Sequence, residues 1–195
     1  MTVQMSARLW RWPLFLASVL VSMLCVWLFK DQSMHIPVAD GPRYTRQFVV
    51  AWMPVFGSIL LIDPTPDITA TLPRARLVYL CLRCSMLIGT LTPLMVVWSD
   101  STDINHNLYD AFAAGALLTL AIITASRWHA AGLLTSSLVS VIWLLIGDTL
   151  ATALRFSDIT GQQLKPGPCN WLLAASTLGT AGVFALRGSG STNWR

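Results

Sequence analysis

Residues 131–154 read AGLLTSSLVSVIWLLIGDTLATAL, an apolar run that carries one charged residue, Asp148. A helix that crosses a bilayer needs roughly 17–25 mostly apolar residues, so this run is long enough to cross once. Five other runs of this kind occur along the chain. The sequence therefore predicts an all-α polytopic membrane protein with about six transmembrane helices in a single domain, residues 1–195. The predicted spans are 13–29, 47–62, 77–98, 109–126, 131–154 and 170–186.

The overall composition excludes most other classes of protein. The chain has 195 residues, of which 54% are hydrophobic and 11% are charged, with a mean hydropathy of +0.60. A soluble domain carries about 25% charged residues, and a disordered chain is far less apolar. The net charge of +4 comes from basic residues that flank apolar runs, so we expect no nucleic-acid partner. The first run has no small-residue cleavage site, and we expect it to be a span rather than a signal peptide.

The basic residues also predict an orientation, because cytoplasmic loops are enriched in Lys and Arg. The loop at 99–107 contains Asp100 and Asp103 without a basic residue, which favours the outer side. We therefore expect an integral plasma (inner) membrane protein in contact with lipid, with both termini cytoplasmic. The inner set is then Arg8, Arg11, Arg74, Arg76, Arg127, Arg187 and Arg195, and the outer set is Lys30, Arg43, Arg46, Arg155 and Lys165.

Two ionisable residues, Arg83 and Asp148, lie well inside predicted spans, where a charge is costly unless it is paired, hydrated or extended to the interface. They lie roughly 10 Å and 25 Å from the inner ends of their spans, so we expect no direct pair. Arg83 either extends to the inner headgroups or has a role in the membrane. Asp148 either forms hydrogen bonds near the outer interface or lines a polar cavity that faces the outer leaflet.

The chain shows no signature of catalysis or metal binding. Cys81 and Cys84 form a C-x-x-C pair, which is typical of redox sites but also of small residues packed in a helix. His35, His106 and His129 fall in three predicted loops, so no metal site is expected. Phosphate-binding glycine motifs and hydrolase motifs are missing, and the chain is not expected to be an enzyme or to hold a cofactor. Any ATP and Mg²⁺ would bind to a partner subunit.

The loop between the second and third spans is the most informative polar segment. It begins with residues suited to a helix N-terminus, continues with two apolar residues on one face, and ends in a proline and two arginines. This pattern predicts a short amphipathic helix on the cytoplasmic side that docks a partner; the alternative is a capped loop that contacts only headgroups. The candidate docking residues within 63–76 are Thr65, Asp67, Ile68, Leu72, Arg74 and Arg76.

Small residues four positions apart predict close helix contacts, either within the chain or between subunits. The pairs are Ala111 with Gly115, Ala175 with Gly179, and Ala181 with Ala185.

Three segments carry a resemblance to a known family. They are DITATLPRAR at 67–76, the pattern from Asn107 through GALL to Arg127-Trp128, and WLLAASTLGTAGVFALRG at 171–188. Together they resemble the small six-span permease-like subunits of actinobacterial ABC transporters, of the ABC-2 exporter type. The family usually has Glu where this chain has Asp67, and its larger members have a longer segment before the first span.

The resemblance implies a permease subunit that exports an amphipathic compound, a peptide or a lipid. A separate ATPase subunit would dock on loop 63–76, and a second membrane subunit would complete a homodimer or a related heteropair. Two other functions stay open. The chain could be a non-catalytic integral subunit of a larger, energy-transducing complex, or a thiol- or cofactor-dependent membrane protein that uses Cys81 and Cys84.

Overall fold

The computed structural model describes residues 2–29, 32–35, 42–61, 88–99, 102–128 and 130–187, and nearly all of them are helical. These ranges contain six helical segments. Five are α1 (Thr2–Phe29), α2 (Thr45–Leu61), α5 (Ile104–Trp128), α6 (Ala130–Ala153) and α7 (Pro168–Arg187). The sixth, Ile88–Ser99, is a shorter apolar helix that precedes α5 in the chain.

A small β-structure was not expected from the sequence. Strands β1 (Ser33–His35) and β2 (Pro42–Tyr44) pair antiparallel between α1 and α2, with Met34 opposite Arg43. An Asp-Gly dipeptide at 40–41 is the signal that could have predicted this pair, because it favours tight turns between strands. The predicted all-α class is confirmed, because this pair of three-residue strands is a minor addition to a helical structure.

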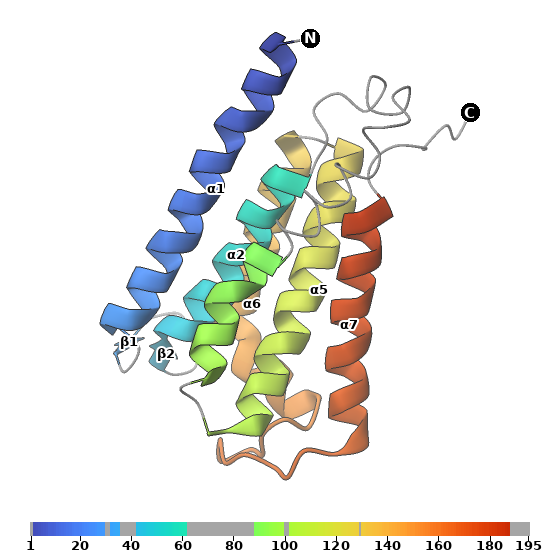
Figure 1. Cartoon of the computed structure of the whole chain (residues 1–195). Helices are drawn as coiled ribbons and strands as arrows, with labels where there is room; N and C mark the ends of the chain where they lie inside the picture. The colour runs from blue at the N-terminus through green and yellow to red at the C-terminus, as the bar shows by residue number, and fades with distance from the viewer. Residues whose placement is uncertain are drawn as a thin grey trace, which may run out of the picture.

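Successive helices run in alternating directions along the bundle (Figure 1). α1 begins at the end of the bundle where α7 finishes. The opposite end carries the two strands, the first residues of α2, α5 and α7, and the last residues of α6. We call this the hairpin end. It collects side chains that are far apart in the sequence, and the candidate site lies there.

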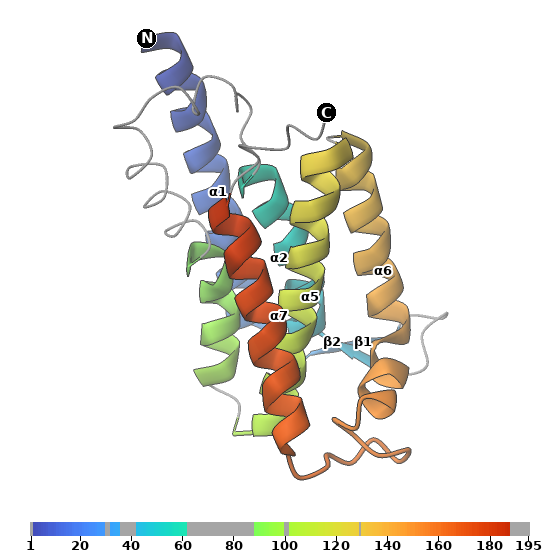
Figure 2. The same ribbon diagram turned by 90° about the vertical axis from the view of Figure 1, so that its right-hand side faces the viewer.

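α5 is the central helix of the bundle, with α2, α6 and α7 packed around it (Figure 2). About 67% of the stretch Ile104–Thr124 is buried inside the molecule, compared with 22% of the apolar stretches of α6 and α7. The side chains of α5 that face the other helices are mostly alanine and leucine, which allow close packing. Its buried residues include Ala111, Ala113, Ala114, Leu117, Leu118 and Ala121.

The closest helix contact involves Gly115 of α5. A β-carbon at this position would lie 2.7 Å from the backbone nitrogen of Leu178 in α7. Gly179, by contrast, would meet nothing within 4 Å. The small residues Ala111 and Gly115 therefore allow close helix packing within the chain. Ala175 and Gly179, by contrast, lie on an exposed face of α7. Ala181 and Ala185 are buried beside α5 residues Leu118 and Ile122.

Much of the outer surface of the bundle is apolar. Leu20, Leu134, Leu138 and Leu172 each expose more than 60% of their surface, a feature that suits lipid rather than water. Three helices are long and apolar enough to cross a membrane by length and composition: the stretches Ile104–Thr124, Gly132–Ala153 and Pro168–Leu186. The apolar helices indicate a membrane protein. The number of spans and the single-domain organisation stay predictions.

Candidate functional site

Polar side chains from three helices gather at the hairpin end of the bundle. The first group comes from the start of α2, where Gln47 Oε1 accepts a hydrogen bond from the Tyr44 backbone N–H over 3.1 Å. The Thr45 hydroxyl donates to the Phe29 carbonyl over 2.6 Å, which holds the end of α1 beside the start of α2. Arg46 follows, and its guanidinium carbon lies 5.4 Å from the centre of the Tyr44 ring. These contacts fix the direction in which Arg46 enters the bundle.

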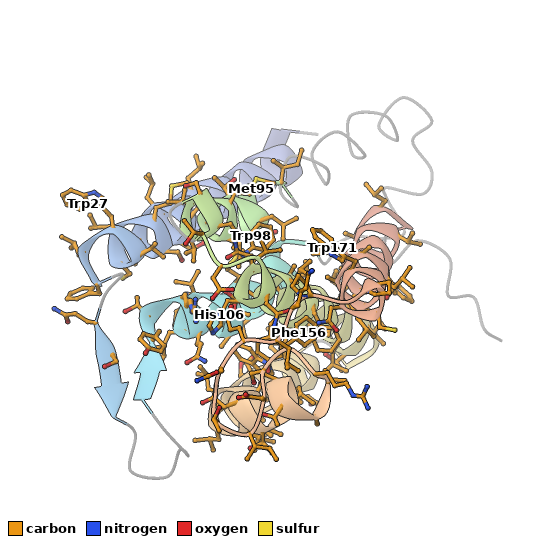
Figure 3. The ribbon with its side chains drawn as sticks, turned by 90° about the horizontal axis from the view of Figure 1, so that it is seen from below. Trp27, Met95, Trp98, His106, Phe156 and Trp171 are labelled. Atoms are coloured by element: carbon orange, nitrogen blue, oxygen red, sulfur yellow. The ribbon has the colours of Figure 1, made fainter. Side chains whose placement is uncertain are left out.

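The second group comes from the start of α5. Asp103 caps this helix, because its Oδ1 accepts a hydrogen bond from the Asn105 backbone N–H over 3.2 Å. Its Oδ2 lies 3.2 Å from Nδ1 of His106. Seen from the hairpin end, His106 lies among the helices near the middle of the bundle, whereas Trp27 projects from the periphery (Figure 3). Asp110 follows His106 by one turn of the same helix.

The third group belongs to α6. Asp148 is exposed, and its Oδ1 accepts a hydrogen bond from Nε2 of Gln47 over 3.4 Å, which joins α6 to α2. The Tyr109 hydroxyl donates to the Gly147 carbonyl over 2.5 Å and joins α6 to α5. His106 therefore has charged neighbours on three helices: Arg46 on α2, Asp103 at the start of α5, and Asp148 on α6.

Asp110 is the buried charged residue of this cluster, and Arg46 is half-buried beside it. Asp110 is only 2% exposed, and Arg46 is the charged group that acts on it. Within the described part of the chain, Oδ2 of Asp110 and Nε of Arg46 are buried without a hydrogen-bond partner. A charged side chain within a membrane helix is costly unless it is paired or hydrated, so the carboxyl group of Asp110 calls for a functional explanation.

A buried hydrogen-bond network closes the hairpin end beside this cluster. The Asn105 side-chain amide donates to the Phe156 carbonyl, and the Asn170 side-chain amide lies 3.3 Å from both Asn105 Oδ1 and the Arg155 carbonyl. Both asparagines are at most 4% exposed. The network fixes the starts of α5 and α7 and the segment after α6 relative to one another.

The loop between α6 and α7 is ordered by its own polar groups. Asp158 Oδ1 accepts hydrogen bonds from the Thr160 hydroxyl over 2.7 Å and from the Gln162 backbone N–H over 2.8 Å. The Thr160 hydroxyl, followed by backbone N–H groups, holds the pKa of the Asp158 carboxyl below its usual value. Gly161 completes the turn at φ +79°. This turn leaves Ile159 at the tip of the loop, 96% exposed.

A small cavity lies further inside the bundle, between α2, Ile88–Ser99 and α5. It is lined by Met53, Thr90, Leu91, Ala114 and Leu118 and has a volume of about 10 Å³. A cavity of this size has room for about one water molecule. Ala114 lies one turn beyond Asp110 along α5, so the cavity lies next to the polar cluster on the inner side.

Of the predicted site residues, only Asp148 belongs to the described part of the chain. It joins the cluster at the hairpin end through Gln47. The docking residues and the buried arginine lie outside the described residues, as do both cysteines of the C-x-x-C pair: Thr65, Asp67, Ile68, Leu72, Arg74, Arg76, Arg83, Cys81 and Cys84.

The sequence interpretation missed the central members of the cluster. The predicted span at 109–126 includes Asp110, but no role was expected for this residue, and His106 was expected in a loop. α5 begins at Ile104 instead, so His106 lies on the same helix as Asp110. The N-cap position of Asp103, directly before Ile104, is the signal that could have corrected the boundary. No group of three or more potential metal ligands occurs among the described residues.

Comparisons of the chain with family models, with curated proteins and with solved structures give no match. The resemblance to ABC permease subunits therefore stays a prediction from the sequence segments that carry it.

Proposed function

We propose that this chain is an integral membrane protein that serves as the permease subunit of a transporter. In this proposal all six helical segments cross the membrane, and the hairpin end faces the outside. The observation that carries the proposal is Asp110, an aspartate buried among the apolar helices, with the half-buried Arg46 of α2 as the charged group that acts on it. Ionisable groups inside membrane helices are rare and usually mark substrate or ion pathways.

The proposed energy source is a separate ATPase subunit. It would dock on the cytoplasmic loop at 63–76, and closure of the ATPase would move the spans as rigid bodies. A second membrane subunit would complete the transporter as a homodimer or a related heteropair. The resemblance described above supports this part of the proposal. The exported substrate would be an amphipathic compound, a peptide or a lipid.

The test is affinity purification of the full chain from its native host in a mild detergent, followed by mass spectrometry. We expect an ATPase at near-stoichiometric yield. Asp67→Lys or Arg76→Glu should remove the ATPase from the preparation, because each reverses a charge in the docking loop. Lys165→Glu is the matched control: it reverses an exposed charge at the hairpin end and should leave the complex intact.

A different set of partners would contradict the proposal. If redox proteins or other membrane subunits co-purify without any ATPase, the chain is a non-catalytic subunit of a larger complex. If Asp67→Lys and Lys165→Glu weaken ATPase binding equally, loop 63–76 is not the docking site.

A further inference from the structure

Three ionisable side chains follow one another along α5 from the hairpin end into the bundle: Asp103, His106 and Asp110. Spacings of three and four residues place them on one side of the helix, over about 10 Å of its axis. The side chains of Asp103 and His106 are 42% and 39% exposed. Asp110 is 2% exposed. The series therefore leads from water at the hairpin end to a buried carboxyl group.

Charged residues of the neighbouring helices α2 and α6 act on this series of side chains. Arg46 of α2 acts electrostatically on both His106 and Asp110, and Asp148 of α6 acts on His106. The Tyr109 hydroxyl is bound to the Gly147 carbonyl. Between Cys169 and Arg187, α7 has no ionisable residue, and Ile88–Ser99 has none. Arg46 is thus the only cation among these charged neighbours.

We propose that Asp110 is a proton-exchange site inside the bundle, loaded from the hairpin end through Asp103 and His106. In the loading direction, His106 takes a proton from a hydronium ion beside Asp103, which leaves water, and passes a proton to Oδ2 of Asp110. The histidine ring returns to its neutral form, and the carboxylate becomes a neutral carboxyl group. Release follows the same path in reverse, so the step needs no other reactant.

The structure favours a proton over a larger ligand. Within the described part of the chain, Oδ2 of Asp110 is buried without a hydrogen-bond partner, which leaves it able to take a proton. An ionised carboxylate that is buried without full hydrogen bonding is costly, so uptake of a proton relieves this cost.

This inference goes beyond the proposed permease function, because it concerns the chain by itself and holds for any energy source.

The full chain, purified and reconstituted into phospholipid vesicles, would be studied by infrared difference spectroscopy between about pH 5 and about pH 9, a range that includes the usual titration of histidine. We expect a C=O stretching band from a protonated carboxyl group that appears on acidification. Asp110→Asn should remove it. Asp158→Asn, in the turn between α6 and α7 and outside the proposed relay, should leave it in place.

Two more variants test the proton site at Asp110 and the route through His106 separately. Asp110→Glu keeps a carboxyl group and should move the band rather than remove it, which guards against misfolding of Asp110→Asn. His106→Gln should keep the band but slow its response to a pH jump by about tenfold or more, because the relay is broken. A band that is unchanged in both Asp110 variants, or no such band at any pH, would overturn the proton site. An unchanged rate in His106→Gln would overturn the route.

Discussion

Arg155 ends α6 in a left-handed backbone conformation, with φ at 60°. Two hydrogen bonds form the helix-ending motif that normally has glycine at this place: Phe156 N–H to the Ala151 carbonyl, over 2.8 Å, and Arg155 N–H to the Thr152 carbonyl, over 3.0 Å. We expect Arg155→Gly to raise the free energy of unfolding by up to about 1 kcal/mol, because glycine adopts this conformation without strain. Thermal unfolding in detergent, followed by circular dichroism, measures this change. A loss of stability would mean that the Arg155 side chain contributes more than its backbone strain costs.

Asp158 makes the order of the loop between α6 and α7 dependent on pH. Its pKa is lowered in the folded loop, chiefly by the Thr160 hydroxyl, so the loop gains stability when the carboxyl group is ionised. This gain is present above the unfolded value, about pH 4, and is lost as the pH falls through the lower folded pKa. The protection of the Thr160 and Gln162 amides from hydrogen exchange, relative to the intrinsic exchange rate at each pH, should therefore decrease in acid. In Asp158→Asn this dependence should vanish, and its persistence would assign the effect to another group.

At the scale of elements, the contact between α5 and α7 depends on Gly115. We expect Gly115→Ala to lower the free energy of unfolding by about 1–3 kcal/mol, because the new methyl group would overlap the backbone at Thr177 and Leu178. The overlap involves backbone atoms, so the two helices have to separate. Chemical unfolding in mixed micelles measures the difference.

Gly179→Ala is the matched control for this contact. Nothing lies within 4 Å of the added β-carbon, and alanine is a better helix former, so stability should rise by about 0.5–1 kcal/mol. Equal losses in the two variants would show that Gly179 also packs closely, against a second subunit.

The helices were more predictable than the site, for a physical reason. Hydropathy is a local property, so the apolar runs at 109–126, 131–154 and 170–186 predicted α5, α6 and α7 closely. Hydropathy shows which residues suit a lipid environment, but it does not show at which residue the helix begins. α5 therefore begins before the predicted span, and His106 lies on the helix rather than in a loop.

Contacts between distant residues left no signal in the sequence pattern. Asn105 and Asn170 meet across 65 residues, and Gln47 and Asp148 across 101. Each pair forms because helices of alternating direction bring their ends together at the hairpin end. Asp148 was predicted to be hydrogen-bonded near the outer interface or to line a polar cavity, and it bonds to Gln47; the side of the membrane on which it lies stays a prediction.

At the scale of the whole molecule, both proposed functions depend on which end of the bundle faces the outside of the cell. The proton route opens at the hairpin end, whereas the proposed ATPase docks on loop 63–76. These two functions are compatible with the predicted topology only if the hairpin end is outside and the loop is in the cytoplasm.

Cysteine accessibility in intact cells tests this orientation most directly. All four native cysteines would be replaced by serine, and single cysteines introduced by Ile159→Cys and Thr69→Cys. Ile159 is 96% exposed at the tip of its loop, so a membrane-impermeant maleimide should label it without permeabilisation. The cysteine at position 69 should be labelled only after the membrane is opened. Labelling of position 69 but not of position 159 in intact cells would contradict the predicted orientation and the outward opening of the Asp110 site.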